Sequence, residues 1–158
     1  MKALVIYDSF FGNTEQIAQA LGTALGSLGD ADTIQVDRAQ PERIKGLDIL
    51  IVGSPTRGFR PTPAIVGFLK AIPTKGLKGM KVAAFDTRIS TSDIKSSALR
   101  FLVTVGGYAA KHIADRLEKK GGRLTIPPEG FFVTGEKGPL KEGELERAAV
   151  WAIGILAG

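Results

Sequence analysis

Apolar residues gather along the chain in short runs that predict strands. Three runs contain almost no polar residue and a fourth alternates with polar residues; they cover positions 3–7, 47–52, 80–85 and 33–36. A strand buried on both faces of a parallel sheet has no polar side, and the three continuous runs show this pattern. Two more apolar segments, 124–126 and 131–133, flank a Pro-Pro-Glu-Gly stretch and predict a last strand that is interrupted.

Between these runs the apolar spacing changes to three and four residues, which predicts helices. The first helix begins near residue 13 and is expected to bury one face, made of Ile17, Leu21, Ala24, Leu25 and Leu28. Further helical stripes lie at 65–72, 99–103 and 110–117, with a break at Gly106 and Gly107 and a weak short helix at 42–45. The C-terminal helix is expected to point five residues inward: Leu145, Ala148, Ala149, Ala152 and Leu156.

Strands alternate with helices five times, which indicates an α/β fold: a doubly wound parallel sheet with helices on both faces, in a single domain over residues 1–158. Folds of this kind bind ligands beyond the carboxyl ends of the strands, where the strand order reverses. Three loops that follow predicted strands carry ligand-type groups, at 9–14, 53–63 and 86–88. We expect these loops to converge on one crevice.

The first loop has the composition of an anion site. Ser9, Asn13 and Thr14 offer hydroxyl and amide groups to a terminal phosphate, and Gly12 lets the backbone approach closely. The unpaired N–H groups and the dipole of the following helix also favour an anion. A plain capped helix start uses the same residue types, so both interpretations stay open. The Lys of a nucleoside-triphosphate loop and the three-glycine dinucleotide pattern are both missing.

Aromatic residues of the first two loops are candidates to cover a flat ring. Phe59 in the second loop, with Phe10 or Phe11 in the first, can stack on such a ligand. We expect at least one of Phe10 and Phe11 to pack under the loop instead.

Three arginines lie in or beside these loops. Arg57, Arg60 and Arg88 can each face an anionic ligand edge, pair with Asp8 or Asp86, or remain solvated. Arg88 is the best placed for a ligand, because it leaves the carboxyl end of a strand.

Composition narrows the class of protein. The 158 residues include one His and no Cys, so disulfides, thiolate ligands, Cys nucleophiles and His metal clusters are excluded, and we expect no metal. The net charge is +5, and residues 70–123 carry twelve Lys or Arg against four Asp or Glu. No nucleic-acid motif accompanies this charge, so we interpret it as a solvated helix face. No apolar run approaches the ~20 residues that span a bilayer, and the N-terminus leaves no room for a signal peptide, so a cytoplasmic protein is expected.

The loops at 9–14 and 53–58, at this spacing, resemble the flavin loops of the flavodoxin-like family, and the segments 129–133, 138–140 and 143–145 are similar to those of small single-domain members. The resemblance covers essentially the whole chain. It implies a five-stranded sheet in the order 2-1-3-4-5, noncovalent binding of FMN and a role in electron transfer. The partner would be a redox protein or a small-molecule acceptor, with no nucleic acid or membrane involved.

The resemblance also implies roles for individual residues. The FMN phosphate would be held by Ser9, Gly12, Asn13 and Thr14, with backbone N–H groups from Phe10 and Phe11. The isoalloxazine would be bordered by Pro55, Thr56, Arg57, Gly58 and Phe59, and Gly58 stands where the family often has a peptide that flips on reduction. The third flavin loop would contain Asp86, Thr87 and Arg88, and no catalytic residue is expected.

Three features depart from the family pattern. Phe11 stands where flavodoxins usually have Thr or Ser, residues 89–92 include no Tyr to stack on the flavin, and the chain is basic where electron carriers are usually acidic. Two alternatives therefore stay open: an FMN-dependent NAD(P)H:quinone-type reductase, and a non-redox module of the same fold with weak or no FMN binding. A phosphoacceptor receiver domain is excluded, because the first strand is followed by Asp8 alone and the third ends in Gly-Ser-Pro.

Overall fold

Ten strands and helices follow one another in the computed structural model, which describes residues 1–90, 96–98 and 108–158. They are β1 (Lys2–Tyr7), α1 (Asn13–Gly26), β2 (Asp30–Gln35), β3 (Ile49–Pro55), α2 (Pro63–Ala71), β4 (Lys81–Ile89), α4 (Ala109–Lys119), β5 (Arg123–Leu124), β6 (Glu129–Val133) and α5 (Glu144–Ala157), with short 3-10 turns η1 (Val36–Arg38) and η2 (Pro41–Ile44). The helical stripe expected at 99–103 and the break at 106–107 lie outside the described residues. None of the described helices is long and apolar enough to cross a membrane.

The strands form one parallel sheet in the order β2-β1-β3-β4-β5, which confirms the predicted fold. The last strand is interrupted, as expected: β5 pairs with the start of β4 at Lys81 and Val82, and β6 pairs with its end, from Phe85 to Ile89. The prediction that β4 ends at Phe85 was wrong. The strand continues to Ile89 because β3 and β6 supply hydrogen-bonding partners on both sides.

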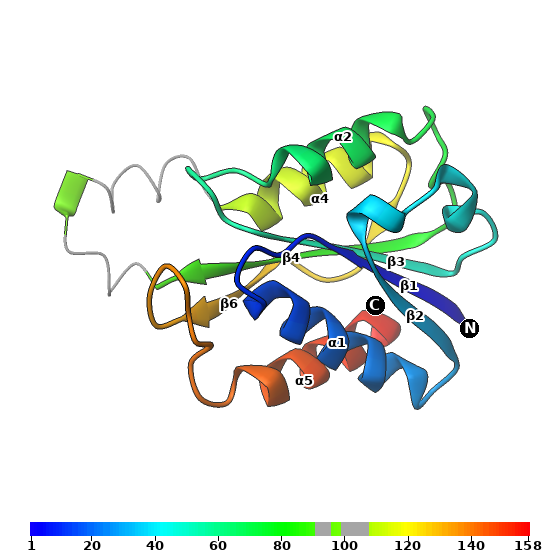
Figure 1. Cartoon of the computed structure of the whole chain (residues 1–158). Helices are drawn as coiled ribbons and strands as arrows, with labels where there is room; N and C mark the ends of the chain where they lie inside the picture. Colours follow the sequence, from blue (N-terminus) through cyan, green and yellow to red (C-terminus); the bar gives the residue numbers. More distant parts are fainter. Residues whose placement is uncertain (91–95, 99–107) are drawn as a thin grey trace.

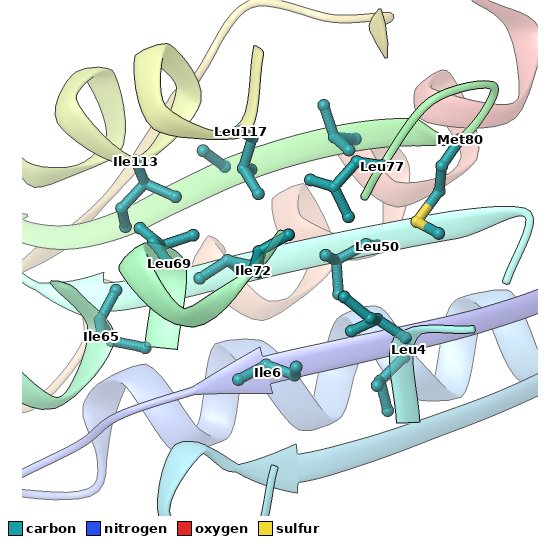
Figure 2. Close-up of a cluster of buried hydrophobic side chains, with 14 of the residues drawn as sticks. Leu4, Ile6, Leu50, Ile65, Leu69, Ile72, Leu77, Met80, Ile113 and Leu117 are labelled. Atoms are coloured by element: carbon teal, nitrogen blue, oxygen red, sulfur yellow. The ribbon is translucent and has the colours of Figure 1, made fainter. Parts of the chain in front are cut away.

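Helices cover both faces of the sheet (Figure 1), with α2 and α4 on one side and α1 and α5 on the other. Side chains along each strand alternate between the two layers. On β1, Leu4 and Ile6 face α2 and α4, whereas Ala3 and Val5 face α1 and α5. Figure 2 shows the first layer, where Leu4, Ile6 and Leu50 lie beneath side chains of α2 and α4.

Two apolar residues that we expected to be buried are exposed. Leu28 is 54% exposed because it lies beyond the end of α1, and Leu145 is 41% exposed in the first turn of α5. Of the expected inward face of α5, Ala148 and Ala152 are buried, and Ala149 and Leu156 are only partly so. Trp151 and Ile155 complete that face, and the indole packs edge-on against Phe85 and Phe131.

A buried carboxylate fastens α5 to β6. The carboxylate of Glu144 accepts hydrogen bonds from the backbone N–H of Phe132 (2.7 Å) and from the guanidinium of Arg147 (2.7 and 2.9 Å), which also donates to the carbonyl of Gly130 (2.6 Å). Burial raises the pKa of Glu144, but these hydrogen bonds and the charge of Arg147 outweigh it, so the pKa lies below its ordinary value of 4.5.

This lowered pKa predicts a loss of stability in acid. Glu144 stabilises the folded chain above its unfolded-state pKa of 4.5, and that contribution disappears as the pH falls through the lower folded-state pKa. Urea unfolding between about pH 5 and pH 3 should therefore show a shallower fall in unfolding free energy for Glu144→Gln than for wild type. Glu146→Gln, at an exposed position of α5, should keep the wild-type slope. Equal slopes for wild type and Glu144→Gln would contradict the assignment.

Candidate functional site

A crevice of about 270 Å³ lies at the carboxyl ends of β1, β3 and β4. It brings together eleven of the predicted site residues: Ser9, Phe10, Phe11, Asn13, Thr14, Pro55, Thr56, Arg57, Gly58, Thr87 and Arg88. Gly12, Phe59 and Asp86 lie nearby but do not line it. Ile89, Val133 and Glu136 line it and were not predicted. The position of Val133 at the carboxyl end of β6 was a usable signal, whereas nothing in the sequence singled out Glu136.

The first loop turns back on itself through its own hydrogen bonds. The N–H of Ser9 donates to Asp8 Oδ1 (3.0 Å), and the N–H of Gly12 donates to Ser9 Oγ (3.1 Å). Gly12 has φ 89°, in the left-handed region that favours glycine, and α1 begins at the next residue. The loop thus delivers the start of α1 to the crevice.

The start of α1 leaves backbone donors free. Gly12 occupies the N-cap position, so no side chain caps the helix, and the first bonded N–H is that of Gln16, which donates to the carbonyl of Gly12 (3.1 Å). Within the part of the chain that the structure describes, the N–H groups of Asn13, Thr14 and Glu15 have no partner. The start of α1 therefore lacks the side-chain cap of a plain capped turn, and free N–H groups at a helix N-terminus, with the helix dipole, favour an anion.

The side chains of Asn13 and Thr14 join this loop to its neighbours. Asn13 Nδ2 donates to the carbonyl of Lys137 (3.2 Å), in the loop between β6 and α5. Thr14 Oγ1 and Thr87 Oγ1 lie 2.8 Å apart, both buried, and link α1 to the end of β4. One hydroxyl of this pair donates to the other, so the second hydroxyl hydrogen stays available to a ligand.

Phe10 and Phe11 stand at the mouth of the crevice. Phe10 is 54% exposed and Phe11 is 45% exposed, so the expectation that at least one packs under the loop was wrong. The guanidinium of Arg57 lies 4.9 Å from the centre of the Phe10 ring, and the ammonium of Lys137 lies 5.9 Å from that of Phe11. Both cations lie within the ~6 Å of a ring centre over which cation–π attraction acts.

The second loop ends in a tight hairpin. The N–H groups of Arg57 and Arg60 each donate to the other's carbonyl (2.9 and 3.0 Å), and the two residues between them have positive φ, 54° at Gly58 and 67° at Phe59. Two positive φ angles define a type I′ turn. This backbone costs a residue with a side chain roughly 1–2 kcal/mol, so Phe59 is held in a strained conformation beside the crevice.

The end of β4, which the sequence predicted as the third loop, contains a buried ion pair. Asp86 is fully buried, and its carboxylate accepts from Arg88 Nε (2.6 Å) and Nη2 (2.8 Å) and from the N–H of Ala110 at the start of α4 (2.8 Å). The guanidinium lies 3.7 Å from the centre of the Tyr108 ring, and a Cβ at Gly130 would overlap it. Burial raises the pKa of Asp86, opposed by Arg88 and Ala110. Of the three roles open to Arg88 from the sequence, the structure therefore selects pairing with Asp86.

The flavodoxin family model matches residues 5–151. The chain belongs to the flavodoxin family. The matched range includes the loops at 9–14 and 53–63 and the strands that end at the crevice. The match supports the FMN-binding electron-transfer function expected from the sequence.

Solved flavodoxins share this family fold. A flavodoxin from the domain Archaea has a TM-score of 0.78 at 22% identity, with 99% of this chain and 97% of that chain covered. Oxidised flavodoxin 1 from Bacillus cereus has a TM-score of 0.76 at 18% identity, with 99% and 98% covered. Rubredoxin oxygen:oxidoreductase from Desulfovibrio gigas matches at TM-score 0.75 and 21% identity, but only 35% of that larger chain is covered.

Proposed function

We propose that this chain binds FMN noncovalently in the crevice and carries electrons to and from a redox partner. The observation that supports the proposal most strongly is the uncapped start of α1: the N–H groups of Asn13, Thr14 and Glu15 have no partner among the described residues, and Asn13 and Thr14 line the crevice. A flavin nucleotide needs a site for its phosphate next to a site for its ring, and the crevice offers both kinds of surface.

The phosphate end of the crevice suits a monoester. Backbone N–H groups and the helix dipole carry the charge compensation, with the hydroxyls of Ser9 and of the Thr14–Thr87 pair as further partners. Gly12 has no side chain to obstruct the ligand, and nothing lies within 4 Å of the place where its Cβ would be.

The ring end is bordered by Pro55, Thr56 and Gly58 of the second loop and by Phe10 of the first. The flavin, when bound, supplies the electron-accepting and electron-donating chemistry. The chain contributes orientation and the exclusion of water: the Arg57–Phe10 stack bridges the first and second loops, and the Asp86–Arg88 pair holds the end of β4 in place.

Titration with FMN tests the proposal. The purified protein should show a flavin absorption spectrum, or acquire one on adding FMN, with quenched flavin fluorescence. Thr14→Leu removes one hydroxyl of the Thr14–Thr87 pair, which we propose as a partner of the FMN phosphate. The variant should bind FMN roughly tenfold or more weakly, the equivalent of one lost hydrogen bond of about 1.4 kcal/mol. Thr23→Leu, at an exposed position of the same helix, should leave the affinity unchanged.

Two results would count against the carrier. If the protein stays colourless after FMN is added, the fold assignment is unaffected but the proposed function is contradicted. Steady oxidation of NAD(P)H with a quinone by the FMN-loaded protein would point to the reductase instead.

A further inference from the structure

Two phenylalanine rings and three cations surround the mouth of the crevice. Phe10 and Phe11 are each about half exposed, with Arg57 over the first ring and Lys137 over the second. Arg60 is exposed and faces Arg57 across the hairpin of the second loop. We call these five residues the rim.

The charge of the rim is unbalanced. None of its three cations forms an ion pair with the residues that the structure describes. Glu136 is the one carboxylate among the crevice-lining residues in the described part of the chain. The rim therefore carries net positive charge, in agreement with the +5 charge of the whole chain.

The arrangement of the rim favours a protein over a small anion. A small anion needs donors that converge on one point, whereas Arg57 and Lys137 lie over different rings. Half-exposed aromatic rings with a guanidinium already stacked on one of them are typical of the anchor residues of protein interfaces. A positive rim of this kind complements a surface rich in carboxylates.

We infer that the rim is the docking surface for an acidic redox partner protein. The inference rests on the proposed function for what the partner exchanges, electrons, but not for the contact itself. Docking at the rim places the partner over the crevice, where the proposed cofactor would lie.

Two forms of one probe protein test the sign of the charge. Native cytochrome c presents lysines around its haem. Succinylation acylates these lysines, so that each positive ammonium is replaced by a group that ends in a carboxylate. ¹⁵N-labelled protein, as purified and after adding FMN, would be titrated with each form at about 10 mM ionic strength, where charges act over about 30 Å. The succinylated form should shift and broaden the amide signals of the rim, with a Kd at least about tenfold below that of native cytochrome c.

Charge reversal on the protein supplies the matched comparison. Arg60→Glu with Lys137→Glu should weaken binding of the succinylated form about tenfold, as should raising the salt to 0.15 M. Lys78→Glu with Lys119→Glu makes the same change of charge far from the crevice, at the amino ends of the strands, because Lys78 precedes β4 and Lys119 ends α4. This double variant should alter the Kd by less than about twofold.

Three outcomes would overturn the inference: tighter or equal binding of native cytochrome c, amide shifts centred away from the rim, or equal effects of the two double variants. The FMN titration is read separately. Docking at the rim without FMN binding would support the docking surface and contradict the proposed function. FMN binding without docking at the rim would contradict the docking surface alone.

Discussion

An Arg88→Ala variant is expected to lose about 3–5 kcal/mol of its free energy of unfolding. The guanidinium makes two hydrogen bonds to Asp86, which has no exposed surface, so its removal leaves a buried carboxylate without its cation. It also takes a cation from the ring of Tyr108 and opens space beside Gly130. Urea unfolding at neutral pH measures the loss directly.

A matched ion pair on the surface provides the control. Arg43 pairs with Asp32 at 2.5 Å, but both side chains are about half exposed, and Arg43→Ala should cost less than about 1 kcal/mol. Gly130→Ala offers a second test that keeps both charges, because the added methyl overlaps the guanidinium and should also destabilise the chain. Equal losses for Arg88→Ala and Arg43→Ala would show that the buried pair has no special role.

A Gly12→Val variant is expected to weaken FMN binding by roughly a hundredfold or more, or about 2.7 kcal/mol. A β-branched residue is strongly disfavoured at φ 89°, so the loop must change its backbone where it delivers the free N–H groups of α1. The bond from the Gly12 N–H to Ser9 Oγ would break with it. Fluorescence titration with FMN measures the change in affinity.

Gly46 separates this effect from backbone strain in general. It has φ 74° and, like Gly12, nothing within 4 Å of its Cβ position, but it lies just before β3, at the edge of the sheet opposite the crevice. Gly46→Val should reduce stability and leave the FMN affinity nearly unchanged. A similar loss of affinity in both variants would mean that Gly12 acts only through global stability.

The strands and the crevice could be predicted from local patterns, and the sheet order from the family resemblance. Continuous apolar runs marked the buried strands, and the family resemblance gave their order. The loops at their carboxyl ends then had to meet at one edge. Eleven of the predicted site residues do line the crevice, although their contacts with FMN remain a proposal.

The end of β4 could not be predicted, because its polar residues are satisfied by partners far along the chain. Asp86 and Arg88 look like loop residues in the sequence. Contacts with Ala110, Tyr108 and Gly130, far along the chain, make them compatible with a buried strand. For Phe10 and Phe11 the opposite error arose: at least one of the two was expected to pack under the loop, and both stand exposed at the rim. The local sequence pattern shows whether a residue is polar. It does not show which residue far along the chain will contact it.

Which residues form the buried face of α5 also could not be predicted from the sequence. Apolar residues occupy most positions between 145 and 156, so several helical faces fit the three-and-four spacing equally well. Burial of Trp151 against Phe85 and Phe131 selects one of them.

The interruption of the last strand has a consequence for self-association. An uninterrupted strand at the border of a sheet offers a row of unpaired backbone groups to which another chain can add. Here β5 has only two residues, and Pro127 and Pro128 follow before β6 begins. Along β6, the N–H of Lys141 donates to the carbonyl of Phe132 (2.9 Å) and Leu140 pairs with Val133. This border therefore gives a second chain no continuous template for strand addition.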